Sequence, residues 1–335
     1  MEMERIKLDH GSGGKLSQQL MEDIILPAFG NPLLNELHDG AVLSLNGKTA
    51  FTTDSYVVKP LFFPGGNIGK LSVCGTVNDL AMTGAVPKYL SVGMILEEGF
   101  LIADLKKIVA SMKVAAEEAG VIIVTGDTKV VDKGAAEGIY INTAGIGEII
   151  ENTQISPRRV RPGDVAILSG CIGDHAATIM AGRHDLVLPD SIQSDCAPLS
   201  GLVASMLKQV PEISVLRDPT RGGVAATLNE IAGQAGCGIL LQEDAIPVRP
   251  EVRGVCDILG FDPLYLANEG KFLCFVEEKF SQQLLTLMQA HPYGKDAAVI
   301  GRVTDDNKGQ VGMKTSIGGI RLVDMPLGIQ VPRIC

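Results

Sequence analysis

The chain has 335 residues, 46% of them hydrophobic, with 39 glycines and no tryptophan, a length and composition typical of two α/β domains with many tight turns. Its net charge of −10 argues against a nucleic-acid partner. No apolar run is long enough to cross a bilayer and no signal-peptide core follows the first residues, so we expect a cytoplasmic protein that does not enter the membrane.

The first half alternates segments typical of strands and helices. Two strand segments flank Asp54, and a run of small and apolar residues then predicts a helix. A second helix is amphipathic and ends at Gly120, because glycine commonly terminates helices. The predicted elements are strands at 50–53, 56–58, 89–96, 121–124 and 139–149, and helices at 68–82 and 101–119.

A connecting segment at 151–163 separates the two halves, since it holds two prolines, three arginines and no apolar periodicity. Domain boundaries fall in segments of this kind, so we predict an N-terminal domain at 1–155 and a C-terminal α/β domain at 156–324. The elements predicted for the second domain are strands at 165–169, 213–216, 264–277 with a polar turn at 268–270, 297–303 and 309–323, and helices from Asp174 and at 199–208, 223–235 and 280–290.

The last eleven residues, 325–335, predict a flexible tail that carries Cys335. Pro326 and Pro332 cannot continue a helix, and eleven extended residues span about 35 Å. Arg333 favours the nucleophilic thiolate of Cys335, whereas the terminal carboxylate opposes it. From the tail alone, a frayed end that happens to finish in cysteine is the plainer interpretation.

The remaining cysteines are scattered and include no Cys-x-x-Cys pair, so neither a zinc site nor a disulfide framework is expected. They lie among apolar or small residues, where cysteine usually serves packing. These residues are Cys74, Cys171, Cys196, Cys237, Cys256 and Cys274.

Four aspartates follow or interrupt apolar strands beside glycine or other small residues. Isolated carboxylates at strand ends usually form turns or cap helices, but four in apolar surroundings favour metal binding, because buried carboxylates must be paired or bind a cation. Oxygen ligands without His or Cys favour Mg²⁺, which typically arrives with substrate phosphates. The predicted metal ligands are Asp39, Asp54, Asp79 and Asp127.

Two glycine-rich stretches offer backbone N–H groups to an anion. The segment 11–15 could surround a phosphate and place Lys15 beside it. It lacks Walker A spacing, so taken alone it is a weak signal, and a flexible glycine-rich end is the plainer explanation. Arginines 217 and 221 precede Gly222 and Gly223, which open a predicted helix. A helix N-terminus beside arginines is a natural anion site, and a capped helix with a surface ion pair is the alternative.

Three further polar residues lie in apolar surroundings. Lys129 follows Asp127 by two residues, and Glu269 lies in the polar turn between apolar segments. Their local sequence also fits ordinary surface charges. His175 could cap a helix or line a cleft, and a structural role is the more common one for a lone histidine.

Seven motifs along the chain together resemble a known superfamily. They lie at 39–42, 53–55, 75–87, 126–129, 173–175, 217–223 and 268–270. Their order is similar to that of the aminoimidazole ribonucleotide synthetase-like ATP-binding superfamily, over nearly the whole chain. The 9–15 segment and the 332–335 ending resemble, within it, the HypE family of hydrogenase maturation factors, which are carbamoyl dehydratases. Ala176 departs from this pattern, because we expect glycine there.

The resemblance implies an α/β fold with mixed sheets, namely a two-domain aminoimidazole ribonucleotide synthetase-like fold with a flexible C-terminal tail. It also implies a homodimer formed through the N-terminal domain, with ATP and Mg²⁺ near the dimer interface. The implied reaction begins when a HypF-type carbamoyltransferase loads a carbamoyl group on Cys335. ATP-dependent dehydration then converts this S-carboxamide to an S-cyanate. The HypC–HypD complex accepts the cyano group, which becomes a cyanide ligand of the [NiFe]-hydrogenase iron.

The chemistry of the implied reaction leads us to expect roles for individual residues. Cys335 carries the reacting group, Glu269 accepts protons and Lys129 orients the carboxamide, although the last two roles could be exchanged. The four aspartates would hold the metal. The residues implied in nucleotide binding are Gly13, Gly14, Lys15, Asn78, Gly126, Asp127 and Thr128.

Two alternatives remain open at this point. Another ATP-using member of the superfamily is possible, such as a selenide water dikinase-like enzyme. That enzyme needs a reactive residue near the N-terminus, whereas the first cysteine here is Cys74, within a predicted core helix. A nucleotide-regulated binding module, whose tail docks on a partner without chemistry, is the alternative from a different class.

Overall fold

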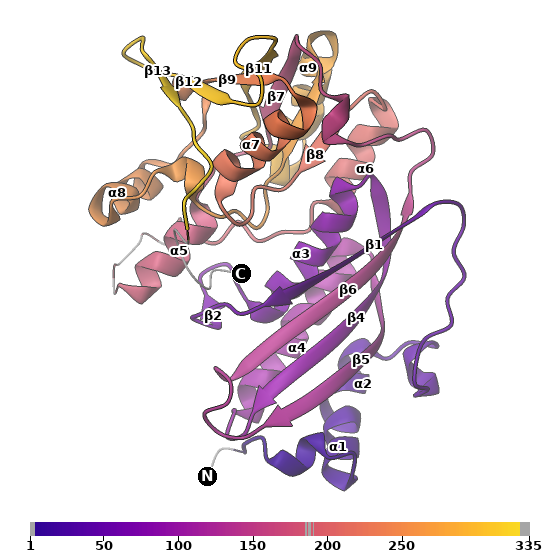
Figure 1. Cartoon of the computed structure of the whole chain (residues 1–335). Coiled ribbons are helices and arrows are strands. Elements are labelled where there is room, and N and C mark those ends of the chain that lie inside the picture. The colour runs from indigo at the N-terminus through magenta and orange to yellow at the C-terminus, as the bar shows by residue number, and fades with distance from the viewer. Residues whose placement is uncertain (1–3, 185, 187–188, 190, 329–335) are drawn as a thin grey trace.

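The computed structural model describes residues 4–184, 186, 189 and 191–328. The predicted tail, 325–335, therefore lies outside the described residues from position 329 onward, and Cys335 with it. Within the described part, two large sheets occupy successive halves of the chain, and a two-stranded sheet lies in the first half (Figure 1). The mixed α/β class expected from the sequence is confirmed.

The first sheet has four strands in the order β1-β6-β4-β5. β4 and β5 pair in parallel, whereas β6 is antiparallel to both of its neighbours. Two helices cover one face of this sheet (Figure 1). The elements are β1 (Thr49–Tyr56), α3 (Ile68–Met82), β4 (Ala85–Glu97), α4 (Ile102–Ala119), β5 (Ile122–Val131) and β6 (Ile139–Ile149).

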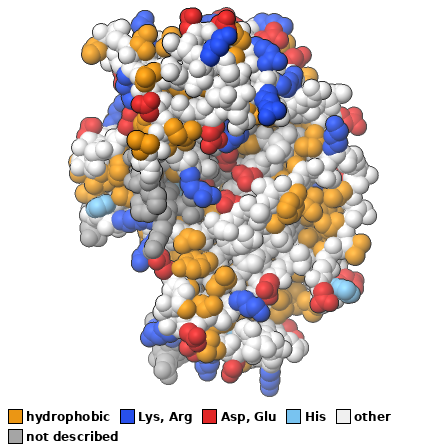
Figure 2. All heavy atoms as spheres, viewed as in Figure 1, with side chains coloured by type: hydrophobic (Ala, Val, Ile, Leu, Met, Phe, Trp, Pro, Cys, Tyr) orange, Lys and Arg blue, Asp and Glu red, His pale blue; other side chains and the backbone are white. Residues whose placement is uncertain are grey.

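The opposite face of this sheet is uncovered and carries apolar side chains. The strand register places Phe51, Ile146, Tyr89 and Ile122 in one row across the four strands. Phe51 is 69% exposed and Ile122 is 44% exposed. Hydrophobic side chains also gather over this face in the space-filling view (Figure 2). An apolar sheet face of this kind is typical of a protein contact surface.

The second sheet has seven strands in the order β13-β12-β9-β11-β7-β10-β8, and β9 and β12 form its parallel pair. Alternate residues of β7 point to opposite faces, where Ala166 packs with α7 and Val165 packs with α6 and α9. The elements are β7 (Asp164–Leu168), α5 (Asp174–Arg183), α6 (Ser200–Gln209), β8 (Val215–Arg217), α7 (Gly223–Ala235), β9 (Gly238–Gln242), α8 (Pro250–Leu259), β10 (Leu273–Glu277), α9 (Glu278–Gln289), β11 (Ala298–Thr304), β12 (Val311–Lys314) and β13 (Ile320–Leu322).

Short elements complete the chain. The N-terminal ones pack along β5 and beside α4, and a small hairpin precedes α3. They are η1 (Leu8–Gly11), α1 (Lys15–Leu20), η2 (Met21–Ile25), α2 (Leu26–Phe29), η3 (Leu34–Glu36), β2 (Phe62–Phe63), β3 (Gly66–Asn67), η4 (Pro157–Arg159), η5 (Glu243–Ala245), η6 (Pro263–Tyr265) and η7 (Pro292–Gly294).

The two halves share buried surfaces. Ala81 and Met82, at the end of α3, belong to the apolar cluster that α6 and α9 form with the second sheet. Residues of α5 and α8 pack in the cluster that holds the first sheet and its helices. No helix in the described part of the chain is long and apolar enough to cross a membrane.

The structure departs from the predicted elements at several points. β1 is continuous through Asp54, and β5 extends to Val131 instead of ending at 124. β5 continues because its pairing with β4 supplies hydrogen bonds through Gly126, where a Cβ atom would lie only 2.3 Å from the Val92 carbonyl oxygen. Helix α8 and strand β9 were not predicted at all.

Candidate active site

Four carboxylates from separate elements approach one another between the two sheets. Asp54 lies in β1, Asp79 in α3, Asp218 directly after β8, and Glu269 in the turn before β10. Thr52 Oγ1 donates a 3.0 Å hydrogen bond to Asp79 Oδ2. We call these four residues the carboxylate cluster. It brings together two of the four predicted metal ligands and the predicted proton acceptor.

Burial and the charges of neighbouring carboxylates raise the pKa of Asp79, Asp218 and Glu269 in this cluster. Burial raises the pKa of Asp79, and the charge of Asp54 raises it further. Burial and the charge of Asp79 raise the pKa of Asp218 to about 7. Burial also raises the pKa of Glu269 well above its ordinary value of 4.5, and the charges of neighbouring carboxylates add to this effect. Carboxyl groups perturbed in this way favour a site for proton transfer or cation binding.

Glu269 is buried and keeps one carboxylate oxygen without a hydrogen-bond partner in the described part of the chain. The residue is only 4% exposed, and its Oε1 atom has no hydrogen-bond partner among the described residues. A buried carboxylate oxygen without a donor is costly. Such an atom is free to accept a proton or a hydrogen bond from a bound group.

Two arginines border the cluster. Arg221 Nη2 lies 3.6 Å from Asp54 Oδ1, with a side chain that is 78% exposed. Arg217 Nη2 pairs with Glu230 Oε2 at 2.7 Å. Gly222 is the N-cap of α7, with φ of 77°, so the predicted helix begins where expected. The exposed guanidinium of Arg221 can therefore meet an anion that approaches the cluster from solvent.

A different part of the chain surrounds two adjoining cavities along β5. One cavity of about 360 Å³ is lined by the 10–13 segment and by Gly126, Asp127, Thr128 and Lys129. A neighbouring cavity of about 170 Å³ shares part of this β5 wall and is otherwise mostly apolar. Its apolar lining residues include Met21, Ile25, Phe29, Leu33, Val92 and Met94. A polar cavity joined to an apolar one suits a ligand with a charged end and a flat apolar end.

The glycine-rich 11–15 segment contributes unequally to the polar cavity. Gly13 lines it with φ of 78°, and Gly11 packs so closely that a Cβ atom there would lie 2.6 Å from the Val130 nitrogen. Gly14 is the N-cap of α1, and Lys15 is its exposed first residue. Neither is among the residues that line the cavity.

Within one chain, the cavities and the carboxylate cluster lie at opposite edges of the first sheet. The register aligns Asp54 with Thr143, Val92 and Gly126 in one row, and three strand spacings amount to about 14 Å. Lys129 lies further along β5, on the edge away from β1. A single chain therefore does not bring Lys129 and Glu269 to one small substrate.

The remaining predicted residues occupy varied positions. Asp39 is exposed in the loop before β1 and lines neither cavity. Asn78 is 2% exposed, and its Nδ2 donates to the Ala197 and Glu269 carbonyls at 3.0 and 3.4 Å. His175 is buried, and its Nδ1 lies 2.8 Å from Ser194 Oγ. Asn78 and His175 thus have structural contacts in this chain.

The donor set fits a magnesium ion that arrives with a nucleotide better than a preformed metal cage. The described residues contain no group of three or more His, Cys, Asp or Glu side chains placed to hold a metal. Mg²⁺ needs only one or two protein carboxylates when phosphates and water supply its other ligands. Asp79 and Asp54 could serve in this way, because their negative charges lie close together.

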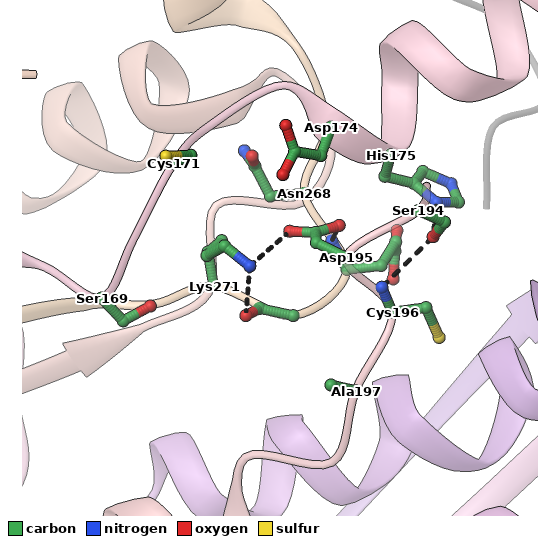
Figure 3. Close-up of polar contacts among 12 residues, drawn as sticks. Ser169, Cys171, Asp174, His175, Ser194, Asp195, Cys196, Ala197, Asn268 and Lys271 are labelled. Carbon is green, nitrogen blue, oxygen red and sulfur yellow. Dashed lines mark hydrogen bonds and ion pairs between the residues drawn. The ribbon is translucent and has the colours of Figure 1, made fainter. Parts of the chain in front are cut away.

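Sequence reasoning missed several parts of the site. Asp218 was quoted within a motif but not recognised as a member of a carboxylate cluster, which only the fold assembles. His10 and Ser17 line the polar cavity; His10 lies in the 9–15 segment but was not singled out, and Ser17 lies outside every motif. The buried ion pair of Asp195 with Lys271 (Figure 3) joins residues that are far apart in the chain, so no local pattern could have indicated it.

Two family models match the chain. The model described as AIR synthase related protein, N-terminal domain, matches residues 37–149. The model described as AIR synthase related protein, C-terminal domain, matches residues 161–314. The carbamoyl dehydratase HypE of Rhodobacter capsulatus is 52% identical over 335 residues, covering 99% of this chain and 98% of that protein. The carbamoyl dehydratase HypE of Escherichia coli (strain K12) is 49% identical over 339 residues, covering 99% and 100%.

Solved structures give the same relationship. A crystal structure of the hydrogenase maturation protein HypE in complex with ATP superposes with a TM-score of 0.95 at 50% identity, covering 98% of this chain and 99% of that one. The match to a HypE–HypF complex has a TM-score of 0.81 at 48% identity, covering 92% and 99%. A thiamine-monophosphate kinase from Stenotrophomonas maltophilia, with a TM-score of 0.65, 15% identity and coverage of 83% and 89%, shares the fold alone.

Proposed function

The chain belongs to the AIR synthase related family and, within it, to the HypE carbamoyl dehydratases, and from this premise we propose that it converts an S-carboxamide on Cys335 to an S-cyanate at the expense of ATP. The observation that carries the proposal is the buried Glu269, whose Oε1 atom has no donor among the described residues, within a carboxylate cluster bordered by Arg221. The resulting cyano group supplies the cyanide ligand of a [NiFe]-hydrogenase iron.

The reaction balances without any redox step. The carboxamide oxygen attacks the γ-phosphorus of ATP, the bond to the β-phosphate oxygen breaks, and ADP leaves. One N–H proton moves to a base, which gives a phosphorylated imidate on sulfur. The C–O bond then breaks, phosphate departs with the carboxamide oxygen, the second N–H proton is lost, and a C≡N bond forms. Phosphorylation is needed because hydroxide is a poor leaving group, whereas phosphate leaves readily.

Glu269 is the proposed proton acceptor. Burial raises its pKa, so the carboxylate is a stronger base than an exposed one, and efficient bases have pKa values near the working pH. Asp218, whose pKa is about 7, lies in the same cluster and is a second group that can hold a proton there. Exclusion of water by this buried site protects the activated intermediate from hydrolysis.

ATP is the proposed nucleotide, and the cavities along β5 are its proposed site. The apolar cavity suits the adenine ring, and the polar cavity with Gly13, Gly126, Asp127 and Thr128 suits the phosphates. Asp39, Lys15, Gly14 and Asn78, which the family resemblance also implies, line neither cavity in this chain. Mg²⁺ bound with the nucleotide would offset the negative charge of the phosphates. Asp127, which lines this cavity, would hold the ion, and Asp54 and Asp79, at the opposite edge of the sheet, would contribute from the second chain of a homodimer.

A homodimer reconciles the separation of these parts. One chain keeps Lys129 and Glu269 at opposite edges of the first sheet, with the row from Asp54 to Gly126 spanning about 14 Å. The uncovered apolar face, which includes Phe51, lies between them and suits contact with a second copy. Packing two copies across this face would bring Lys129 of one chain toward Glu269 of the other. We propose that Lys129 orients the carboxamide in that composite site.

The tail begins close enough to the cluster to deliver Cys335. Pro326 packs beside Gly222, where a Cβ atom would lie 3.2 Å from Pro326 Cγ. The loop before Gly222 contacts the Glu269 turn, because the Asn268 nitrogen donates to the Pro219 carbonyl at 3.1 Å. The seven residues from 329 to 335 could span about 23 Å when extended. We propose that a segment of this length carries Cys335 to Glu269 and away again.

The proposed partners follow from the chemistry of the group carried on Cys335. A HypF-type carbamoyltransferase loads the carbamoyl group, and the solved HypE–HypF complex of a relative supports this pairing. The acceptor of the cyano group is proposed to be a HypC–HypD complex in the cytoplasm. The account requires the thiol of Cys335 to be accessible to both partners in turn.

Intact-mass spectrometry tests the proposal. With the carbamoyltransferase, carbamoyl phosphate and Mg-ATP, the chain should gain about 43 Da on Cys335 and then lose about 18 Da on dehydration. Cys335→Ala should show neither change. A wild-type chain whose tail keeps its mass would favour a nucleotide-regulated binding module. A mass gain without the ATP-dependent loss would leave only a carbamoyl carrier.

A further inference from the structure

The segment between α5 and α6 carries a buried carboxylate that contacts the backbone of Glu269. The Asp195 side chain is only 2% exposed, and its Oδ1 accepts a 3.0 Å hydrogen bond from the Glu269 backbone nitrogen. Its Oδ2 lies 3.3 Å from Lys271 Nζ, and this ammonium also donates to the Gly270 carbonyl at 3.2 Å. Figure 3 shows the Lys271 ammonium between these two acceptors. The turn that carries Glu269 is therefore closed by an ion pair.

Further contacts hold the backbone of the same turn. A Cβ atom at Gly270 would lie 1.8 Å from the Asp195 carbonyl oxygen, so only glycine fits against this segment. Asn78 Nδ2 donates to the Glu269 carbonyl at 3.4 Å, and Asn268 Oδ1 accepts from the Gly173 nitrogen at 2.8 Å. The backbone on both sides of Glu269 is fixed, whereas its Oε1 atom is left free.

Asp195 also borders a polar cavity that Glu269 does not line. The cavity has a volume of about 420 Å³, and Asp174, Asp195, Arg249 and Lys271 contribute to its wall. Arg249 Nε pairs there with Asp174 Oδ2 at 3.1 Å. Oδ2 of Asp195 makes no further hydrogen bond among the described residues, so the ion pair with the Lys271 ammonium is what stabilises its charge.

We propose that Asp195, paired with Lys271, is a positioning residue for the dehydration reaction, which fixes the Glu269 turn and keeps a negative charge beside the Glu269 carboxylate. The inference rests on the proposed role of Glu269 as the base. The charge of Asp195 favours the protonated form of Glu269 and so strengthens it as a base. Asp195 itself contacts neither the carboxamide nor ATP in this account.

Other charged groups also face Glu269 and must be counted. Burial is the largest cause that raises the pKa of Glu269, and electrostatic effects of Cys196, Asp195, Asp218 and Asp54 follow. Tyr56, in β1, also interacts electrostatically with Glu269. Asp54 and Tyr56 belong to the first sheet and Asp218 to the loop after β8. Asp195 differs from all of these because it also binds the Glu269 backbone.

The test measures the single-turnover rate of dehydration of the carbamoylated full-length chain as a function of pH. Asp195→Asn keeps an acceptor for the Glu269 nitrogen but removes the charge, so the acidic limb of the profile should move about one unit to lower pH. Asp195→Ala also removes the acceptor, and loss of positioning should lower the rate about 100-fold. The matched control is Asp296→Asn, because Asp296 lines the same cavity at a side-chain exposure of 45%.

A second variant predicts the opposite direction. Lys271→Gln leaves the Asp195 charge without its cation, so the acidic limb should move to higher pH. Mg-ATP affinity should match that of the wild type in each variant, which separates positioning from misfolding. If the acidic limbs of the pH–rate profiles of Asp195→Asn and Lys271→Gln both coincide with that of the wild type, the positioning role is wrong. If Glu269→Gln keeps the full rate, the base assignment itself is wrong and the inference falls with it.

Discussion

Replacement of Asn78 distinguishes a role in stability from a role in nucleotide binding. The family motif assigns it to nucleotide binding, whereas the structure places its amide between the two domains. Its side chain donates to the carbonyls of Ala197 and Glu269 at 3.0 and 3.4 Å and accepts from the Leu199 nitrogen at 2.8 Å. These three hydrogen bonds are buried, and they join α3 to the segment before α6, through Ala197 and Leu199, and to the Glu269 turn before β10.

Asn78→Ala should therefore lower stability and leave nucleotide binding intact. Each lost hydrogen bond costs about 1 kcal/mol, so three lower the free energy of unfolding by about 3 kcal/mol. This is a lower bound, because the buried Leu199 N–H is also left without a partner. The assay is urea unfolding followed by circular dichroism, combined with the Kd for Mg-ATP at a temperature where the variant is folded. Asn46→Ala is the control, because this residue is exposed and should change stability by less than about 0.5 kcal/mol.

The reasoning would be refuted by the reverse outcome. An Asn78→Ala chain with wild-type unfolding free energy and at least about tenfold weaker ATP binding, which corresponds to about 1.4 kcal/mol, would show that the amide serves the nucleotide. That result would require Asn78 to leave its three contacts when ATP binds.

Three further predictions concern the tail, the dimer and the buried acid. Cys335→Ala should abolish the mass gain from carbamoylation while the Kd for Mg-ATP stays within about twofold, that is within about 0.4 kcal/mol; a persisting gain would place the modified thiol elsewhere. Phe51 is 69% exposed on the uncovered sheet face, so Phe51→Glu should convert the dimer to a monomer and abolish dehydration. Light scattering measures the oligomeric state, and an active monomer would contradict the composite site. The raised pKa of Glu269 means that its ionisation opposes folding, so stability from this group is fully present below pH 4.5 and lost as pH rises through the raised value. Glu269→Gln should therefore be more stable than the wild type at pH 8, with the difference vanishing toward pH 4.5, and a thermal-melting difference that is independent of pH would contradict this.

Sequence periodicity predicted much of the fold, because single elements with strong patterns are decided locally. The bounds of α3, β6 and α7 agree with the predicted 68–82, 139–149 and 223–235. β5 was predicted too short, since Gly126 and Asp127 are common in turns. Its pairing with β4 overrides that local preference, and no single segment reveals such a pairing.

The site was harder to predict than the fold, because it depends on which segments meet. The aspartates were chosen for their shared surroundings, yet the structure separates them: Asp54 and Asp79 join the carboxylate cluster, Asp127 lines the β5 cavities and Asp39 is exposed. Asp218 and Asp195 were not chosen, since their importance comes from neighbours distant in the chain. That Lys129 and Glu269 act on one substrate stays a prediction, and it requires a dimer.

The most direct test of the central claim follows the carboxamide oxygen. The carbamoyl group on Cys335 is prepared with ¹⁸O, and one turnover is started with unlabelled Mg-ATP in unlabelled water. The account predicts one ¹⁸O atom in inorganic phosphate and a mass loss of about 20 Da from the tail, because the oxygen leaves as part of the phosphate. Unlabelled phosphate, with the ¹⁸O retained on the tail or released to water, would contradict dehydration through a phosphorylated intermediate.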